Sequence, residues 1–278
     1  MNRTWNNFKT TLLMAGLMGL CLAIGYIIGG PSALLPSLLI GAVMNLFAFF
    51  FSDKIALATV RAVQVSREDD PLLWDIVQRL AQQADLPMPR LYISPAAAPN
   101  AFATARGPRH SAVCVTAGLR QTLNADELEG VIAHELSHIK HRDILISTIA
   151  AIVAGAISWL GYLAMWSGHD RDRRSNPLVA IFLMVLAPLA AMLIQMAISR
   201  SREFEADRLG AELAGSGRGL AQALRKLDAA NKRIPLPVPD SQSNMFIVAP
   251  LTGSKVARLF ATHPSTEQRI ERLMATER

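Results

Sequence analysis

The sequence contains few cysteines, with only two among its 278 residues. Cys21 lies inside a long apolar run and Cys114 lies in a polar middle segment, so we do not expect the two thiols to meet. This count excludes the disulfide framework that stabilises small secreted domains. Both thiols fit a reducing compartment or simple apolar packing.

A concentrated basic region is also missing. The formal net charge is +6, but lysines and arginines are scattered over residues 52–143 and the C-terminal segment, without a basic helix or interleaved aromatics. Nucleic acid is therefore not an expected partner. Positively charged segments between membrane spans explain the same excess.

Charged residues are absent from four apolar runs, each long enough to cross a bilayer. Hydrophobic residues make up 51% of the chain, which is too apolar for an ordinary soluble domain. No Ala-x-Ala-like cleavage site follows the first run, so we expect a retained anchor and not a signal peptide. The runs are Thr11–Ile28, Leu34–Phe51, Ile144–Trp166 and Leu178–Ile198.

These runs divide the chain into membrane and aqueous parts. We expect N-terminal and second transmembrane hairpins at residues 1–52 and 144–200, and two aqueous parts at residues 53–143 and 201–278. The fold class is a mainly α membrane protein with four transmembrane helices.

The charge pattern favours a multi-pass protein of the inner (plasma) membrane with its aqueous parts in the cytoplasm. Arg3 and Lys9 precede the first run, and the turn at residues 29–32 is uncharged. The loop "SGHDRDRRSNP" weighs against this orientation, because its three arginines would lie outside.

Short patterns predict the elements of the aqueous parts. "DDPLLWDIVQRLAQQADLP" is an amphipathic helix with an acidic cap and a proline in its first turn. "PRLYIS" and "SAVCVTAGL" are expected strands. A capping box of Asn124 and Glu127 begins the next helix, which contains "HELSH". One helix around residues 202–231 and a last helix after "HPSTEQ" complete the prediction.

The "HELSH" helix has the spacing of a metal site. His134 and His138 are four residues apart, so both imidazoles project from one helix face and can share one ion. Glu135 is then placed to act as a general base toward a water molecule without itself being a ligand. The pattern indicates metal-assisted hydrolysis.

A third ligand is expected from "SREFEAD". The metzincin extension is excluded because residue 144 is isoleucine. Glu203 and Glu205 are the candidates, and Asp207 lies one turn beyond Glu203 on the same face. Glu203 can therefore bind the metal while Asp207 orients a histidine ligand. Glu205 has no such partner, and we expect a solvated surface charge.

The second hairpin connects these two motifs. "HELSH" ends just before the hairpin enters the membrane, and "SREFEAD" begins just after it leaves. Two crossings return the chain to the same face, so both helices are expected to meet next to the bilayer.

Together, "HELSH", "SREFEAD" and "THPS" resemble the membrane-bound M48 zinc metalloproteases, closest to the bacterial heat-shock proteases of the HtpX type and more distantly to the Ste24 CAAX prenyl proteases. The resemblance covers nearly the whole chain and includes "PNAFATARGPRHSAVCVTAGL". Ala105 stands where the family usually has glycine. The resemblance implies an α+β, zincin-like (gluzincin) catalytic domain, one Zn²⁺ per subunit, cleavage of membrane or misfolded proteins, and a place in protein quality control.

The same resemblance implies particular residue roles. The metal ligands are His134, His138 and Glu203, the base is Glu135, and Asp207 supports a ligand. His263, in "THPS", is expected to stabilise the oxyanion over the cleft.

Other residues remain open. Asn100, Ala101 and Phe102 either start an edge strand that pairs with substrate backbone or form an ordinary turn into a strand. We expect His141 to be a surface or interfacial residue. Two other functions are an intramembrane (site-2-type) protease and a zinc-binding membrane scaffold without catalysis. The runs after "HELSH" lack Asp, Glu and His, and retention of Glu135 favours catalysis.

Overall fold

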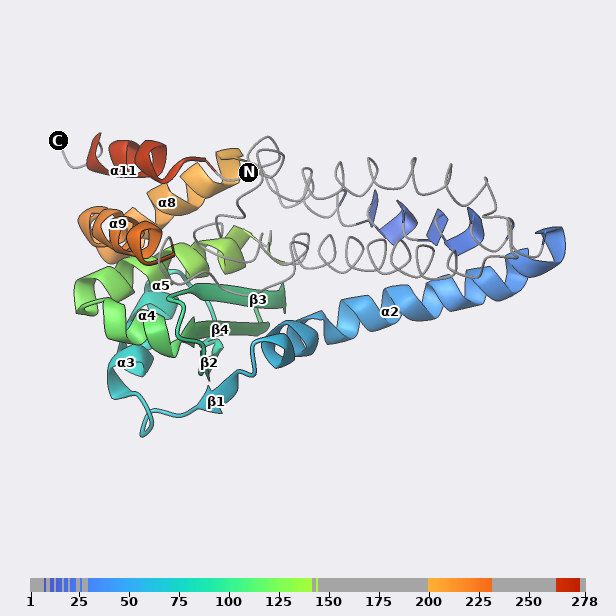
Figure 1. Cartoon of the computed structure of the whole chain (residues 1–278), viewed down its shortest axis with the longest axis horizontal. Coiled ribbons are helices and arrows are strands. Elements are labelled where there is room, and N and C mark those ends of the chain that lie inside the picture. The colour runs from blue at the N-terminus through green and yellow to red at the C-terminus, as the bar shows by residue number, and fades with distance from the viewer. Residues whose placement is uncertain are drawn as a thin grey trace, which may run out of the picture.

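The structure is a computed structural model that describes residues 30–141, 144, 200–231 and 264–275, and residues 8, 11–12, 14–16, 18–19, 21–23 and 26. Figure 1 shows a body of helices and strands from which α2 projects. The elements in chain order are η1 (Gly30–Ala33), α2 (Leu34–Thr59), β1 (Val63–Val65), α3 (Pro71–Gln83), β2 (Arg90–Ser94), β3 (Ala101–Gly107), β4 (His110–Thr116), α4 (Ala117–Thr122), α5 (Ala125–His141), α8 (Arg200–Ala214), α9 (Arg218–Asn231) and α11 (Thr266–Ala275).

The strands form one sheet in the order β1-β2-β4-β3. β2 pairs with β4 in parallel, and the other two pairings are antiparallel. The two predicted strands are confirmed as β2 and β4. β3 begins at Ala101 and lies at one end of the strand order, so among the described strands it is an edge strand.

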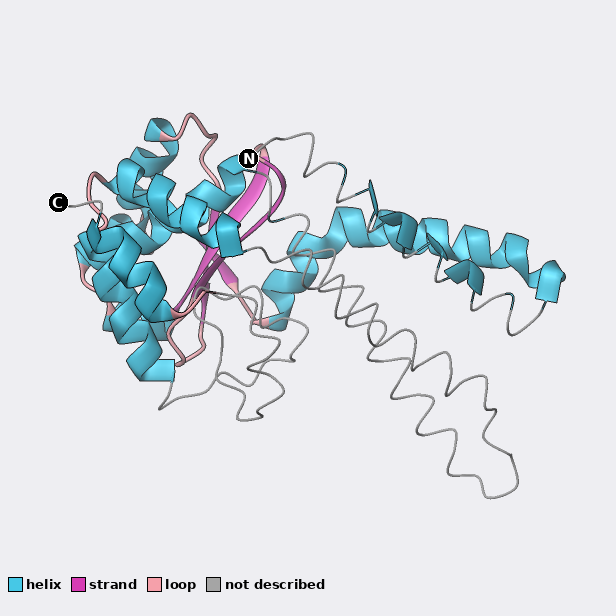
Figure 2. Ribbon diagram, turned by 90° about the horizontal axis from the view of Figure 1, so that it is seen from above, coloured by secondary structure: helices cyan, strands magenta, loops and turns pink. Residues whose placement is uncertain are grey.

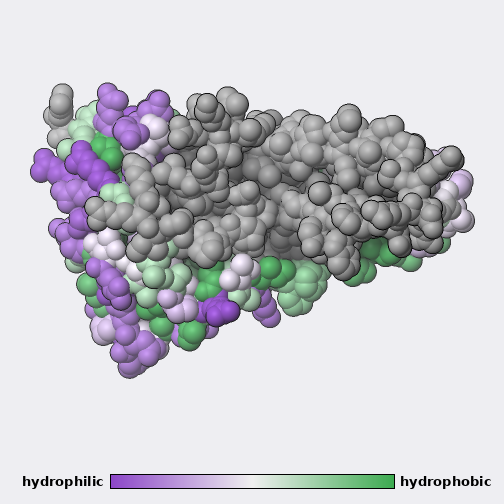
Figure 3. All heavy atoms as spheres, viewed as in Figure 1, coloured by the Kyte–Doolittle hydropathy of each residue, from purple (hydrophilic) through white to green (hydrophobic). Residues whose placement is uncertain are grey.

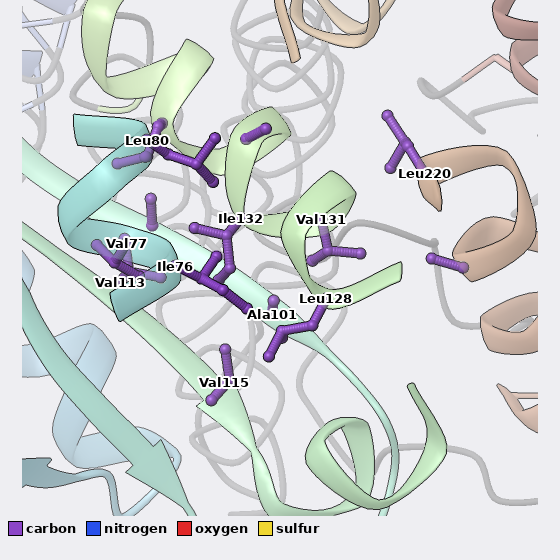
Figure 4. Packing of buried hydrophobic residues seen from close by; sticks show 14 of the residues in the cluster. Ile76, Val77, Leu80, Ala101, Val113, Val115, Leu128, Val131, Ile132 and Leu220 are labelled. Atoms are coloured by element: carbon purple, nitrogen blue, oxygen red, sulfur yellow. The ribbon is translucent and has the colours of Figure 1, made fainter. Parts of the chain in front are cut away.

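Helices cover both faces of the sheet (Figure 2). On one face, Ala101 and Val113 pack with Leu128 and Ile132 of α5 in the main core (Figure 4). Ala101 and Val113 point to the same face of the sheet, because successive side chains of a strand point to opposite faces. On the opposite face, Phe102 packs in a second cluster with the C-terminal part of α2. The sheet thus holds α5 and α2 in fixed positions on its two sides.

The helix starts follow the predicted caps. The Asp70 carboxylate accepts a hydrogen bond from the Leu73 amide at 3.0 Å, and Pro71 is the first residue of α3. The Glu127 amide donates to Asn124 Oδ1, and the Asn124 amide donates to Glu127 Oε2, both at 2.9 Å. The capping box that begins α5 is therefore confirmed, and it fixes the register of the helix that carries "HELSH".

One expected helix proves to be two. The prediction of a continuous helix around residues 202–231 is wrong, because the chain turns between α8 and α9. Gly215 has φ of 75°, a left-handed conformation that ends α8 at low steric cost. The Ser216 hydroxyl then accepts a hydrogen bond from the Arg218 amide at 3.1 Å. The turn lets α8 and α9 both pack on α5.

Within the part of the chain that the structure describes, no helix is both long and apolar enough to cross a membrane. The second expected span coincides with the first two thirds of α2. The first expected span is described only in separate pieces, and the third and fourth fall outside the described residues except for Ile144. The four-span architecture and the division at residues 52, 143 and 200 remain predictions.

Candidate metal centre and active site

Helix α5 presents three adjacent functional side chains to one place. His134 and Glu135 are 1% and 5% exposed, and His138 is half-buried. Because the two histidines are one helical turn apart, their Nε2 atoms lie 3.1 Å from each other. The rings meet nearly edge to face, at an interplanar angle of 89°. Two imidazole nitrogens therefore converge on one point.

Helix α8 crosses α5 and adds a carboxylate at that point. Glu203 Oε2 lies 3.8 Å from His134 Nε2, and Glu203 Oε1 lies 3.9 Å from His138 Nε2. The close approach of the helices depends on Gly210, where an added Cβ would lie 3.0 Å from the His134 amide nitrogen. Among the described residues, His134, His138 and Glu203 are the group whose ligand atoms all lie within 4.8 Å of one another.

These three donors fit a zinc ion. Ligand atoms bound to one tetrahedral zinc at 2.0–2.1 Å lie about 3.4 Å apart, close to the distances between these three side chains. Two imidazoles and one carboxylate leave a fourth position for water, as in catalytic and not structural sites.

Asp207 supports His134 from the side away from Glu203. Its Oδ1 lies 3.0 Å from His134 Nδ1, so the carboxylate accepts the Nδ1 hydrogen and leaves Nε2 free to bind a metal. Asp207 is in turn held by Arg269 of α11, whose Nε and Nη2 donate to its two carboxylate oxygens at 2.8 and 2.6 Å. Arg269 Nη1 also lies 3.8 Å from Glu203 Oε2. One buried cation therefore lies beside two acidic residues of α8, Glu203 and Asp207.

Burial and this cation set the protonation of the site. Burial raises the pKa of Asp207, but the charge and hydrogen bonds of Arg269 outweigh it and lower the pKa to about 2. Burial and the Arg269 charge both lower the pKa of His134, which favours the neutral, metal-binding form. Burial is the main cause that raises the pKa of Glu135 to about 7, which is suited to taking and returning a proton.

Glu135 also faces the edge of the sheet. The backbone of Ala103 in β3 lies close enough to the Glu135 carboxylate to act against the rise in pKa that burial causes. Asn100, just before β3, is 4% exposed, and its side-chain Nδ2 has no hydrogen-bond partner among the described residues. The side chains of Ala101 and Phe102 are buried, so only their backbone can reach a substrate. Glu135 thus lies near β3, and the Asn100 amide, which has no partner among the described residues, lies just before that strand.

The other predicted residues are placed as follows. Glu205 forms an ion pair with Arg208 at 2.7 Å and does not belong to the group of His134, His138 and Glu203. His141 is the last residue of α5 and is half-buried. His263 lies outside the described residues, although Ser265 just beyond it caps α11 by accepting from the Gln268 amide at 3.2 Å.

Sequence reasoning missed Arg269. The signal lay in the last helix, where Arg269 and Leu273 are four residues apart and therefore share one face. Both are buried in the structure. An arginine on the apolar face of an amphipathic helix needs a buried acidic partner, and Asp207 was an available candidate.

Comparison with known proteins identifies the family. The profile described as Peptidase family M48 matches residues 38–277. The chain belongs to peptidase family M48. A "Protease HtpX homolog" from Pelotomaculum thermopropionicum is 51% identical to this M48 peptidase over 277 residues, covering 97% of this chain and 99% of the relative. Another from Pyrococcus furiosus is 51% identical over 271 residues, covering 95% and 94%.

A solved structure shows the same fold. The crystal structure of S. mikatae Ste24p matches with a TM-score of 0.53 and 18% identity, covering 98% of this chain and 66% of that chain. The predicted resemblance is thereby confirmed. The M48 peptidase is a metalloprotease of HtpX-like type with protein substrates, and its fold combines the helices and the sheet described above.

Proposed function

We propose that this M48 peptidase is a membrane-anchored zinc endopeptidase that cleaves membrane or misfolded proteins near the cytoplasmic face, in protein quality control. One observation carries the chemistry: His134, His138 and Glu203 converge from two helices beside a buried Glu135. The donor set supports zinc, and the family supports proteolysis.

The residues of the chain divide the reaction between them. A bound zinc ion would supply Lewis acidity toward water and the scissile carbonyl. The Glu135 carboxylate takes a proton from the attacking water and returns it to the leaving amine. Its raised pKa suits both transfers. His263 is proposed to donate a hydrogen bond to the developing oxyanion.

We assign substrate positioning to the edge of β3. The backbone of Ala101–Gly107 can pair with an extended substrate strand, and the Asn100 side-chain amide can donate to the substrate backbone. This pairing would place a peptide bond beside Glu135, because the backbone of Ala103 in the same strand lies close enough to the Glu135 carboxylate to affect its pKa.

Membrane anchoring is supported by the four uncharged apolar runs and by α2. Many large apolar side chains of α2 are exposed, including Leu39 at 60% and Val43 at 66%. Figure 3 shows hydrophobic residues along the visible lower edge of the projecting part of the molecule. Such a surface is unfavourable in water and fits lipid. The site-2-type alternative is disfavoured, because an intramembrane protease would need its third ligand inside a membrane span. Here Glu203 lies on α8, which follows the predicted second hairpin.

The test uses the purified full-length protein with casein and a membrane-protein substrate. Phenanthroline should abolish cleavage, and added zinc should restore it. Cleavage that persists at full rate in chelator would contradict the metalloprotease chemistry. Stoichiometric zinc without any cleavage would instead support the scaffold alternative.

A further inference from the structure

A pocket of about 490 Å³ lies between α2 and β3, apart from the metal centre. Most of its lining comes from aliphatic and aromatic side chains of α2, including Phe47, Phe50 and Phe51. The other two lining residues among those that the structure describes are cations, Lys54 of α2 and Arg106 of β3. The pocket therefore combines a long apolar wall with two positive charges.

The charges gather at the end of the pocket nearest the sheet. Lys54 follows Phe51 by less than one helical turn, and its Nζ lies 5.4 Å from the Phe51 ring centre. The Arg106 guanidinium carbon lies 5.7 Å from the Phe50 ring centre. Each cation lies over an aromatic ring of α2, and this cation–π contact favours the side-chain position that lines the pocket. In contrast, Phe47 is 51% exposed farther along α2, where the described lining residues carry no charge.

Arg106 retains capacity to bind an anion. Its Nε is buried and has no hydrogen-bond partner among the described residues. Asp53 Oδ1 lies 3.9 Å from this Nε, too far for a hydrogen bond, and also has no hydrogen-bond partner among the described residues. The other oxygen of Asp53 accepts a hydrogen bond from Arg90 Nη2 at 3.1 Å, so one carboxylate serves two arginines. An additional anion would complete the pairing of this cluster.

We propose that this pocket binds an anionic phospholipid, with its phosphate between Lys54 and Arg106 and its acyl chain along Phe47 and Phe50. Charge complementarity selects the headgroup, and the apolar wall selects a lipid over free phosphate. The inference rests on the proposed membrane anchoring. Because Arg106 belongs to β3, the bound lipid would also tie the substrate-facing strand to the membrane surface.

The test measures lipid retention by the full chain in nanodiscs of mixed phosphatidylcholine and phosphatidylglycerol, read by native mass spectrometry after release. Wild type should retain phosphatidylglycerol in preference to phosphatidylcholine. Lys54→Gln and Arg106→Gln should each reduce the preference about fivefold, the effect of one basic side chain at an anionic membrane surface. The double variant should show none. Arg67→Gln is the matched control, since Arg67 is an exposed cation paired with Asp75.

Several outcomes would overturn the lipid site: equal retention of both lipids, a preference that survives in the double variant, or displacement of phosphatidylglycerol by excess inorganic phosphate or by an acidic peptide. Lys54 is exposed, so its variant tests the site even if Arg106→Gln disturbs the fold. Flotation with phosphatidylcholine vesicles is measured in parallel. Failure of wild type to float would refute membrane anchoring itself, whereas flotation without headgroup preference refutes only the lipid site.

Discussion

Arg269 carries a positive charge into the interior with 2% of its side chain exposed. Such a charge is tolerated because Asp207 pairs with it through two hydrogen bonds and Glu203 lies nearby. The arrangement has a functional consequence: Arg269 keeps Asp207 ionised, and the ionised carboxylate holds the Nδ1 hydrogen of His134. α11 thereby supports the candidate metal centre, whose three residues lie on α5 and α8.

Arg269→Met should destabilise the protein, because it leaves Asp207 buried without its counter-charge. We expect a loss of about 3–5 kcal/mol in the free energy of unfolding, measured by denaturant titration of the full chain in detergent. Arg272→Met is the control on the same helix, since Arg272 is exposed and only stacks on Phe204. It should cost about 1 kcal/mol or less. Equal effects of the two changes would contradict the buried pair.

Glu203→Gln and Glu205→Gln should separate a ligand from a surface charge. Removing the Glu203 carboxylate takes away one of three ligands, so zinc should be lost or bound at least 100-fold more weakly. Glu205 pairs with Arg208 and lies outside the cluster, so its variant should keep wild-type zinc content. Elemental analysis after dialysis measures the zinc content of each variant. Loss of zinc from Glu205→Gln with wild-type zinc content in Glu203→Gln would show the assignment to be wrong.

At the scale of the element, close contact between helices depends on residues without side chains. A Cβ added at Gly130 of α5 would lie 2.4 Å from the Leu220 amide nitrogen of α9. Backbone atoms cannot move aside as a flexible side chain can, so the helices must separate. Because α5 carries both histidines, this separation would also displace His134 and His138.

Gly130→Ala should therefore lower stability by about 1–3 kcal/mol, the usual cost of overpacking. Thermal unfolding followed by circular dichroism measures the shift. Gly107→Ala is the control, because an added Cβ there meets nothing within 4 Å. A similar melting temperature for wild type and Gly130→Ala would contradict the tight α5–α9 contact.

Local signals predicted most of these elements, whereas contacts between them needed the structure. The capping pairs fixed the starts of α3 and α5, and strand patterns located β2 and β4, because such signals lie within a few residues. The break at Gly215 was missed because the apolar periodicity continues on both sides of it. Arg269 was missed because its partner is far away in sequence, and no local pattern records that contact.

At the scale of the whole molecule, α5 and α8 lie side by side although a long segment separates them in sequence (Figure 1). The predicted second hairpin explains this arrangement, since two crossings would bring the chain back to the same membrane face. The adjacency predicted between "HELSH" and "SREFEAD" agrees with the structure, which places Glu203 beside both histidines. The membrane crossings themselves remain a prediction.

Accessibility labelling tests this arrangement. Single cysteines are introduced at Lys140 of α5 and Glu212 of α8, both exposed, in a background where Cys21 and Cys114 are replaced by serine and alanine. An impermeant maleimide should modify both positions from the cytoplasmic face of membrane vesicles. Labelling of the two positions from opposite faces would contradict the shared metal site, and labelling of both from the outside would reverse the proposed orientation.

The central claim is that Glu135 moves the proton while His134, His138 and Glu203 hold the metal. The most direct measurement compares Glu135→Gln with wild type in two readings on the same purified protein, zinc content and cleavage rate. We predict about one zinc per chain in both proteins and a loss of cleavage of at least 100-fold in the variant, in line with the contribution of a general base. Cleavage at a rate comparable to wild type would remove Glu135 from this role, and loss of zinc with cleavage would show that Glu135 belongs to the metal-binding set.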